Sequence, residues 1–552
     1  MKQSKRLIAL LLATLSVGSM AACGQENQTE DKRPSIYLSL FNGGYGRVWL
    51  DQIVNDYNAA HPENEYKITV RASKDEFNTI YNQLTAGTAV YDMAFTNAYA
   101  YKMIDANLLE DISSVWDSKP EGSDKTIRQM MIDSENYAEA YKGDNGGLYA
   151  LPWYESVRSF VYDHELFLQY GLLFGQDGNL ITDPAQPLSV GKDGVAGTYD
   201  DGHPETEAQW ELMSTMATNM LGYAFNYSGK FSGYLNEIFL MIHAQYDSVD
   251  KFMLNYTFDG TYDFGDGNGE TEITLENGYR VTEMKGKKVA LEFMDKYLAC
   301  KDTTLGITNK YTYPNASTLS YSHTDAQSDF IVFTARNKTE KIGMLVEGDW
   351  WENESKMVFK DLAEIGYTDY DFRKHDYRFM TLPRFNNQKE EGNVYVVPDN
   401  SYLVLKKQTN ATKRDICKDF MTYALQPKYV QNFTVEAGGV MPYDVELTTE
   451  QKAKLSPFTK NFLELYRDRE NNKFINIQQL QNRSMTQRGG LAVSTSNGEH
   501  YIVINGLYYY SAADYLSKWT NYYAKDDYKN WNTNKAAYLD YLSKKGLTHG
   551  EN

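Results

Sequence analysis

The chain has 552 residues, with 74 acidic and 55 basic side chains and a formal net charge of −19. Phosphate binding needs a cationic surface, so this charge argues against a nucleic-acid partner. The length predicts two or more domains, and the 45 tyrosines favour wet surfaces that present an apolar face and a polar tip, as sugar-handling surfaces do.

The first residues have the pattern of a secretion signal. Basic residues precede an apolar run over Leu7–Val17, which is too short to span a bilayer, and small residues follow it before Cys23. The stretch MAAC resembles a bacterial lipobox, which implies cleavage after residue 22 and lipidation of Cys23. The alternative is an ordinary signal peptide with a chance cysteine. We expect residues 1–22 to be a lipoprotein signal peptide and residues 23–34 a flexible tether.

Strands and helices alternate at the start of the mature chain. Strands are predicted over 35–40, 66–73 and 91–97, with helices over 47–62 and 77–87 between them. This order predicts a parallel α/β sheet, and ligands of such sheets lie in the loops that follow the strands. That rule selects Asn42 and Tyr45 after the first strand, and Asn97 and Tyr99 after the third. The first loop is rich in glycine but lacks the spacings of phosphate-binding loops.

Two insertions rich in glycine and aspartate interrupt the middle of the chain. Residues 174–204 are predicted to be a loop and residues 257–282 a β-hairpin. In the loop, Asp193, Asp200 and Asp201 offer oxygen ligands of the kind that calcium prefers, although their spacing is not that of an EF-hand and a solvated loop is the alternative.

The second half of the chain returns to regular structure. Residues 378–385 and 400–407 are predicted to be strands that return to a sheet, and residues 415–433 one amphipathic helix. Cys300 and Cys417 lie in helical apolar patterns, which predict buried free thiols, with a disulfide as the alternative.

Five stretches, in order, resemble extracellular solute-binding proteins of carbohydrate ABC importers, of the maltodextrin-binding type. They are FNGGYGRVWLDQIVNDYNAAHP, QLTAGTAVYDMAFTNAYAY, GGLYALPWYESVRSFVYDHELF, IGMLVEGDWWENE and AGGVMPY. The resemblance implies a two-lobed type II α/β fold with a hinge and discontinuous lobes. We expect residues 35–152 and 350–440 in the N-terminal lobe, and residues 153–349 and 441–552 in the C-terminal lobe.

The same resemblance implies a function. The protein would bind an oligosaccharide between its lobes, close around it, and deliver it to the permease of an ABC importer. Lipidation of Cys23 would hold it at the outer face of the cytoplasmic membrane of a Gram-positive cell. We expect a monomer without a cofactor, apart from the calcium ion considered above.

Two of these stretches combine the groups that a sugar needs. EGDWWENES and PWYESVR each place aromatic rings, which cover the flat face of a pyranose, beside charged groups that bind its hydroxyls. In the family both stretches lie at crossings between the lobes. The candidate ligand-binding residues are Asn42, Tyr45, Asn97, Tyr99, Trp153, Tyr154, Glu155, Arg158, Tyr223, Asn226, Asp349, Trp350 and Trp351.

Each candidate has a simpler structural interpretation. Adjacent residues face different ways, so we expect one of Trp350 and Trp351 to lie in the core. Trp153 is equally compatible with a packed hinge, and Glu155 and Arg158 are spaced to pair with each other. Tyr223 and Asn226 are compatible with core packing. At the level of function, a cell-surface glycoside hydrolase with two acidic groups and a polysaccharide-binding adhesin are the alternatives.

Overall fold

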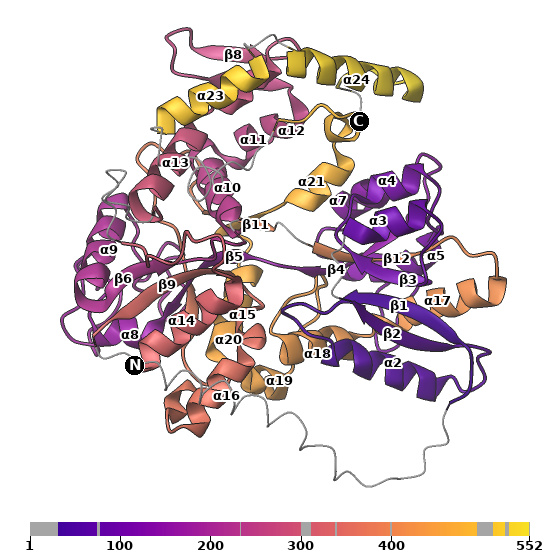
Figure 1. The fold of residues 1–552 in the computed structure, drawn as a ribbon, viewed down its shortest axis with the longest axis horizontal. Helices are drawn as coiled ribbons and strands as arrows, with labels where there is room; N and C mark the ends of the chain where they lie inside the picture. Colours follow the sequence, from indigo (N-terminus) through magenta and orange to yellow (C-terminus); the bar gives the residue numbers. More distant parts are fainter. Residues whose placement is uncertain are drawn as a thin grey trace, which may run out of the picture.

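The structure is a computed structural model that describes residues 31–73, 78–231, 233–299, 311–336, 339–397, 400–493, 512–524 and 529–550. Two sheets, each with its own hydrophobic core, form two lobes that lie side by side in Figure 1. This arrangement confirms the predicted two-lobed α/β fold of the type II binding proteins. In the described part of the chain, no helix is long and apolar enough to cross a membrane.

The first lobe is built on a five-stranded sheet in the order β2-β1-β3-β12-β4. The strands β1 and β2 are parallel, as are β1 and β3, whereas β12 runs antiparallel to both β3 and β4. The predicted strand–helix–strand–helix–strand order is therefore confirmed. The elements are β1 Ser35–Phe41, α2 Val48–Ala60, β2 Lys67–Ser73, α3 Asn78–Thr85, β3 Met93–Thr96, α4 Ala100–Asp105, α5 Ser113–Trp116, α6 Ile127–Met130, α7 Ser134–Tyr141, β4 Ala150–Glu155, β12 Asn400–Leu405, α17 Ala411–Ala424 and α18 Pro427–Ala437.

The second lobe is built on a four-stranded sheet in the order β10-β5-β9-β6. Strand β9 pairs in parallel with β6 and antiparallel with β5, and β5 pairs antiparallel with β10. The elements are β5 Arg158–Asp163, α8 His164–Gln169, α9 Glu207–Leu221, β6 Gly222–Asn226, α10 Tyr234–Asp247, α11 Val249–Phe252, α12 Leu254–Thr257, α13 Lys285–Tyr297, α14 His323–Arg336, β9 Lys341–Gly348, α15 Trp351–Glu354, α16 Lys356–Glu364, the 3-10 helix η2 Thr368–Tyr370 and β10 Tyr377–Met380.

The carboxyl ends of the first sheet face the second lobe. Strand β4 is parallel to β3, because both run antiparallel to β12, and β4 leads within three residues into β5 of the second sheet. The loops that follow β1 and β3 therefore emerge at the boundary between the lobes. Ligands of such sheets bind at this edge.

The predicted lobe boundaries differ from the observed sheets at two places. Residues 350–440 were expected in the first lobe, yet β10 at 377–380 pairs antiparallel with β5 of the second sheet. Conversely, residues 153–155 were expected in the second lobe, but they complete β4, where Glu155 is in register with Asn400 of β12. The chain thus returns to the first sheet only at β12.

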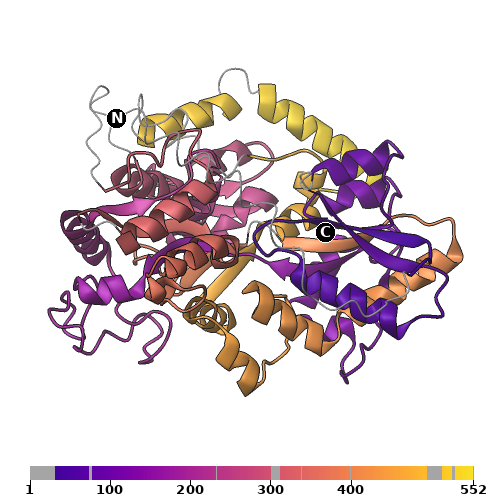
Figure 2. The same cartoon turned by 60° about the horizontal axis from the view of Figure 1, so that its bottom comes forward.

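The last part of the chain adds structure to the second lobe. Strand β13 pairs in parallel with β11, α23 packs on η1 and α13, and the buried Trp531 of α24 packs with residues of the hairpin β7–β8. The hairpin confirms the predicted one. The elements are β7 Gly260–Asp263, β8 Glu270–Ile273, the 3-10 helix η1 Gly278–Glu283, β11 Asn393–Val397, α19 Thr449–Lys454, α20 Pro457–Arg467, β13 Asn472–Asn476, α21 Ile477–Arg483, α22 Met485–Arg488, α23 Ala512–Ala524 and α24 Lys529–Lys545 (Figure 2).

The single helix predicted over 415–433 is two helices. Helix α17 ends at Ala424 and α18 begins at Pro427, because proline has no backbone N–H to continue a helix but fits the first position of a new one. Cys417 lies buried in α17 as a free thiol, as predicted. Cys300 lies outside the described residues.

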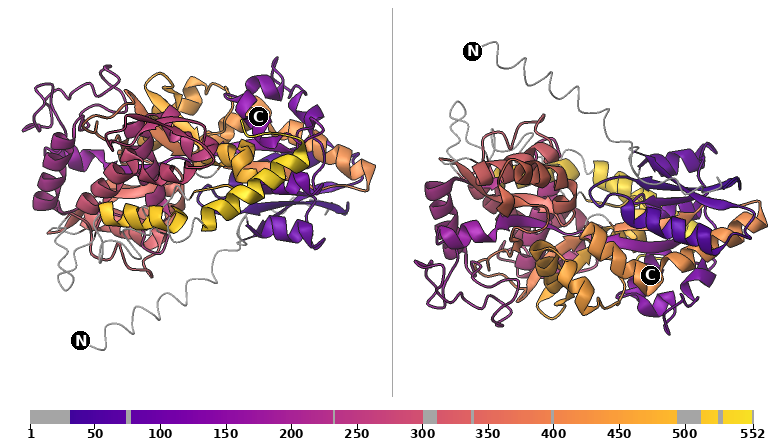
Figure 3. Two further views of the ribbon diagram at one scale, coloured as in Figure 1. Left: turned by 90° about the horizontal axis from the view of Figure 1, so that it is seen from above. Right: turned by 90° about the horizontal axis from the view of Figure 1, so that it is seen from below.

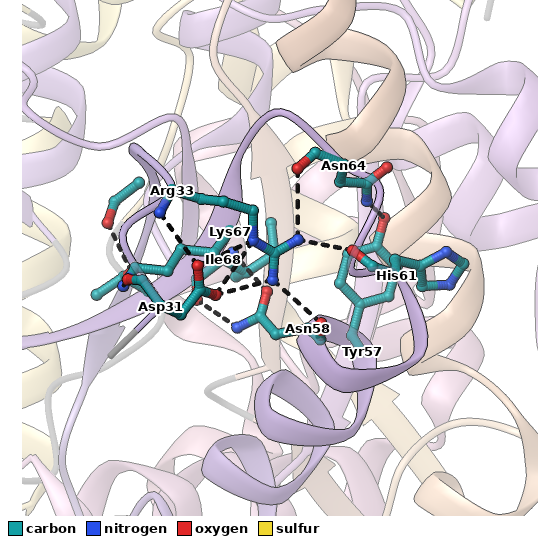
Figure 4. A network of polar contacts seen from close by, with 10 residues as sticks. Asp31, Arg33, Tyr57, Asn58, His61, Asn64, Lys67 and Ile68 are labelled. Atoms are coloured by element: carbon teal, nitrogen blue, oxygen red, sulfur yellow. Dashed lines mark hydrogen bonds and ion pairs between the residues drawn. The ribbon is translucent and has the colours of Figure 1, made fainter. Parts of the chain in front are cut away.

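The start of the described chain is fastened to the first lobe. The Arg33 guanidinium donates hydrogen bonds to the carbonyl oxygens of His61 (2.6 Å) and Asn58 (3.1 Å) at the C-terminal end of α2, and it pairs with Asp31 (Figure 4). A cation is favourable there because the helix end carries partial negative charge. Residues 31–34, which were predicted to belong to the flexible tether, are therefore held by this contact.

Candidate functional site

A cavity of about 340 Å³ lies where the loop after β1 meets the second lobe. The first lobe contributes the end of β1, the loop 43–46 and Trp49, and the crossing between the sheets contributes Tyr154, Ser156 and Arg158. The second lobe contributes Phe231, Tyr234, His323, Trp350 and Glu354. The cavity is therefore built from both lobes and is lined mainly by aromatic rings.

Trp350 forms one wall of this cavity. Its ring lies edge-on to Tyr45 of the first lobe (centroids 6.1 Å apart) and to Tyr234 of the second (5.9 Å). The backbone at Gly44 and Gly348 lies against the indole, since a Cβ at either position would fall 2.2 or 2.3 Å from a ring atom. Both glycines are therefore required to hold the indole in this position.

Arg158 lies beside the same wall. Its guanidinium is 4.4 Å from the ring centroid of Tyr234 and 5.1 Å from that of Trp350, and Nη1 forms a buried ion pair with Glu237 (2.9 Å). Cation–π contacts of this kind are strengthened by burial. Glu155, considered from the sequence as a partner of Arg158, accepts hydrogen bonds from Tyr137, Tyr466 and Asn476.

Asp349, just after β9, is hydrogen-bonded to the loop after β1 and to the crossing between β4 and β5. One carboxylate oxygen accepts a hydrogen bond from the Tyr45 hydroxyl (2.7 Å), and the other accepts one from the backbone N–H of Val157 (2.9 Å). Nearby, the Asn353 amide donates to the Gly44 carbonyl (2.7 Å). Burial raises the pKa of Asp349 to about 7, against the opposing effect of the Tyr45 hydrogen bond. This contact therefore ties the loop after β1 to the second lobe.

A second acidic cluster borders the same cavity as Trp350. Gln327 donates to Glu347 (3.0 Å) and to Glu354 (2.7 Å), and His323 Nε2 lies 3.2 Å from Glu354. Burial, with the nearby Glu354 charge, raises the pKa of Glu347 to about 8. Burial lowers the pKa of His323, but Glu354 outweighs it, so the net shift is upwards. The cluster offers the cavity one carboxylate and one imidazole.

The family model for bacterial extracellular solute-binding proteins matches residues 43–431 of this chain. The chain belongs to this family. Residues after 431 lie outside the match. No curated protein matches the sequence.

Solved structures of low sequence identity share the fold of this solute-binding protein. One concerns xylan utilization by Caldanaerobius polysaccharolyticus (TM-score 0.55, 11% identity, 88% of this chain and 99% of that chain). Another is the GacH receptor of Streptomyces glaucescens, unliganded and with acarbose (0.53, 12%, 89% and 98%). A third is a chitin oligosaccharide binding protein (0.52, 12%, 89% and 98%).

Four of the predicted ligand-binding residues of this solute-binding protein line the cavity, namely Tyr45, Tyr154, Arg158 and Trp350. Asp349 lies directly behind Tyr45. The expectation that one of the adjacent tryptophans lies in the core is confirmed: Trp351 is fully buried among Phe330, Tyr377 and other rings of the second lobe. Contact with a ligand stays a prediction for all of them.

Other candidates lie in the core or away from the cavity. Trp153 is 1% exposed and packs on Trp49 and Phe95, and Asn226 is fully buried with its amide bonded to Tyr321 and Ala326. These contacts agree with the alternative interpretation from the sequence, in which Trp153 packs at the hinge and Asn226 packs in the core. Tyr223 lies near the amino end of β6, the end remote from the first lobe, with its hydroxyl 3.5 Å from Glu340.

Three candidates follow strands of the first sheet but do not line the cavity. Asn42 is exposed, and Tyr99 is 41% exposed beside Lys102. The carbonyl oxygen of Asn97 accepts a hydrogen bond from Gln478 of α21, a segment that the sequence did not connect with this loop.

Sequence reasoning missed four of the five residues that the second lobe contributes to the cavity: Phe231, Tyr234, His323 and Glu354. Phe231 follows β6 and Tyr234 begins α10, so both obey the rule that selected Tyr45, applied to the second sheet. His323 is a solitary histidine in the sequence and carries no spacing signal. Glu354 belongs to the EGDWWENES stretch, where only the residues nearest the tryptophans were selected.

The three aspartates predicted as calcium ligands accept hydrogen bonds from the backbone of their own loop, and calcium binding there stays a prediction. Asp200 accepts hydrogen bonds from the backbone of Lys192 (2.8 Å), Asp193 from Val195 (2.7 Å), and Asp201 from Gly197 (2.6 Å). Among the described residues, no group of three or more acidic, histidine or cysteine side chains is placed to hold a metal ion. The carboxylates instead fix the turns of their own loop.

Proposed function

We propose that this solute-binding protein captures an oligosaccharide in the cavity between its lobes and delivers it to the permease of an ABC importer. The observation that carries the proposal is the aromatic cavity built jointly by the loop after β1 and by Trp350 and Tyr234. A ligand that contacts both lobes at once stabilises the closed arrangement over the open one. The permease can then distinguish the loaded protein from the empty one.

The chemistry of the cavity suits a sugar. Its rings offer flat apolar surfaces to the C–H faces of pyranoses, and Arg158 and Glu354 lie among those rings to bind hydroxyl groups. Sugar-binding relatives support the same class, since one is described with acarbose and another as a chitin oligosaccharide binding protein. The protein is a receptor and not an enzyme in this proposal.

Secretion and anchoring complete the proposal. The lipobox-like MAAC stretch would place a lipid on Cys23 and hold the protein at the outer face of the cytoplasmic membrane. The permease and its ATPase would be separate chains, and the receptor would act as a monomer. Metabolic labelling with a fatty-acid probe tests the anchor: the wild-type protein should carry the label and Cys23→Ser should not. A labelled Cys23→Ser protein would contradict the lipobox interpretation.

Isothermal titration calorimetry against defined oligosaccharides tests the receptor function. The panel contains linear gluco-, xylo- and chitooligosaccharides together with raffinose and stachyose. After each titration, mass spectrometry measures the molecular mass of the sugar to see whether it is intact. We expect one-to-one binding of at least one sugar, which is recovered intact. Absence of heat with every sugar would overturn the proposal, and a shortened sugar would identify a glycoside hydrolase.

A further inference from the structure

The short helix α21 lies against the loop that follows β3. Strands β1 and β3 are neighbours in the first sheet, and both loops emerge at the edge that faces the second lobe. The loop after β1 lines the cavity, whereas the loop after β3 is in contact with α21, which also packs on α7 and α4 of the first lobe (Figure 1). At this edge of the sheet, where ligands usually bind, one loop therefore lines the cavity and the neighbouring loop is covered by α21.

Two amide side chains make the contact between α21 and this loop. Gln478 Nε2 donates to the carbonyl oxygen of Asn97, and the backbone N–H of Tyr101 donates to Asn482 Oδ1 (3.3 Å). Gln478 and Asn482 are four residues apart and therefore lie on one face of the helix. They are only 3% and 0% exposed, so no room for a ligand remains between them and the loop.

Helix α21 contacts both lobes. Ile477 and Leu480 of α21 are part of the hydrophobic core of the second lobe, and β13, which leads into α21, pairs with β11. Just after α21, the Ser484 hydroxyl donates to the carbonyl oxygen of Tyr256 (3.0 Å). The helix therefore packs on both lobes, and it contacts the loop after β3 through amide hydrogen bonds.

The end of the chain covers the same side of the molecule. Seen from above, α23 lies over the second lobe and α24 extends towards the first (Figure 3). At the end of α24, Lys545 pairs with Asp144 and lies 3.7 Å from Asp105, both in the first lobe. These elements follow residue 431, where the family match ends. This last part of the chain therefore spans the two lobes.

We propose that α21 is a specificity wall, through Gln478 and Asn482, that limits the length of the bound sugar. The inference rests on the proposed sugar-binding function. A sugar held against Trp350 and Tyr45 cannot continue along the loop after β3, because α21 occupies that space. Short oligosaccharides fit the cavity of about 340 Å³, and chains extended past the wall are excluded.

The test compares sugars that differ only in length. The mature protein is titrated with the pairs raffinose and stachyose, maltotriose and maltopentaose, xylotriose and xylopentaose, and the chitin trimer and pentamer. For the pair that binds best, we expect the wild-type protein to favour the shorter sugar by about tenfold or more in Kd. In the Gln478→Ala/Asn482→Ala variant, we expect this preference to fall below about threefold.

Two further variants make the outcome decisive. Gln481→Ala is the matched control, because Gln481 is a half-buried glutamine of the same helix and, among the described residues, donates no hydrogen bond to the first lobe. It should keep the wild-type preference. Leu480→Lys removes an apolar anchor of α21 and should lower the preference as the double variant does.

The inference and the proposed function fail in different ways. If sugars bind but longer chains bind as tightly as short ones to the wild-type protein, the wall is refuted while the receptor function stands. The same holds if the preference for short sugars survives in both the double variant and Leu480→Lys. If no sugar binds to any variant or to the wild-type protein, the proposed function fails and the inference fails with it.

Discussion

The adjacent tryptophans are predicted to have separate tasks, which substitutions can distinguish. Trp350 lines the cavity between the lobes, whereas Trp351 is fully buried among Tyr377, Phe458 and other rings. Truncating a buried indole to alanine costs about 3–5 kcal/mol of unfolding free energy. Trp351→Ala should therefore lower stability by that amount, while the folded fraction keeps wild-type affinity for the sugar.

Trp350→Ala should instead weaken sugar binding more than it lowers stability. Its indole covers the ligand face of the cavity, and a central tryptophan in a binding site typically contributes ~2 kcal/mol or more, so affinity should fall about 30-fold or more. Trp350→Phe retains a ring and is the matched control, with a loss of about tenfold or less. Urea unfolding followed by fluorescence gives stability, and calorimetry gives affinity. The reasoning is refuted if Trp351→Ala weakens binding as much as Trp350→Ala does.

Three further predictions concern the surroundings of these rings. Gly348→Ala should weaken sugar binding about tenfold, because its Cβ would lie 2.3 Å from a Trp350 ring atom and displace the indole; unchanged affinity by calorimetry would contradict this. Asp349→Asn should cost ~1–3 kcal/mol of unfolding free energy, because one of the two groups that donate hydrogen bonds to Asp349 loses its acceptor. A double-mutant cycle with Tyr45→Phe should show coupling between the two sites, and additive losses of stability would exclude the contact. Burial raises the pKa of Glu347 from 4.5 to about 8, so the folded protein retains a proton that the unfolded chain releases. The contribution of Glu347 to the free energy of unfolding should therefore fall by about 1.4 kcal/mol per pH unit between pH 5 and 8. Glu347→Gln should reduce this pH dependence of stability, measured by urea unfolding, and a variant with the wild-type slope would refute the reasoning.

Local rules predicted the first lobe and part of the site. The alternation of strands and helices gave the order β1 to β3, and the rule for loops after strands gave Tyr45. The same rule selected Asn97, but the covering helix α21 comes from a segment almost 400 residues later in the chain. A contact over such a separation has no periodicity or spacing in the sequence to reveal it.

The crossings between the lobes were the hardest part to predict, for a related reason. Strand β10 and strand β12 are only 19 residues apart at their ends, yet they belong to different sheets. Both have the same pattern of a short apolar strand, and that pattern indicates burial without identifying the partner strand. The partner strands of β10 and β12 are decided by the tertiary contacts of β5 and β3, which local sequence patterns do not reveal.

The acidic setting of the tryptophans has a physical explanation in the structure. Glu347, Asp349 and Glu352 are all buried, and burial raises their pKa values to about 8, 7 and 7. Carboxyl groups with such values are partly or largely protonated near neutral pH, and a neutral carboxyl costs far less to bury beside an indole than a charged one. The stretch that looks strongly charged in the sequence is thus almost completely buried from solvent, and its carboxyl groups are hydrogen-bonded. It holds Trp351 in the core and leaves Trp350 as a wall of the cavity between the lobes.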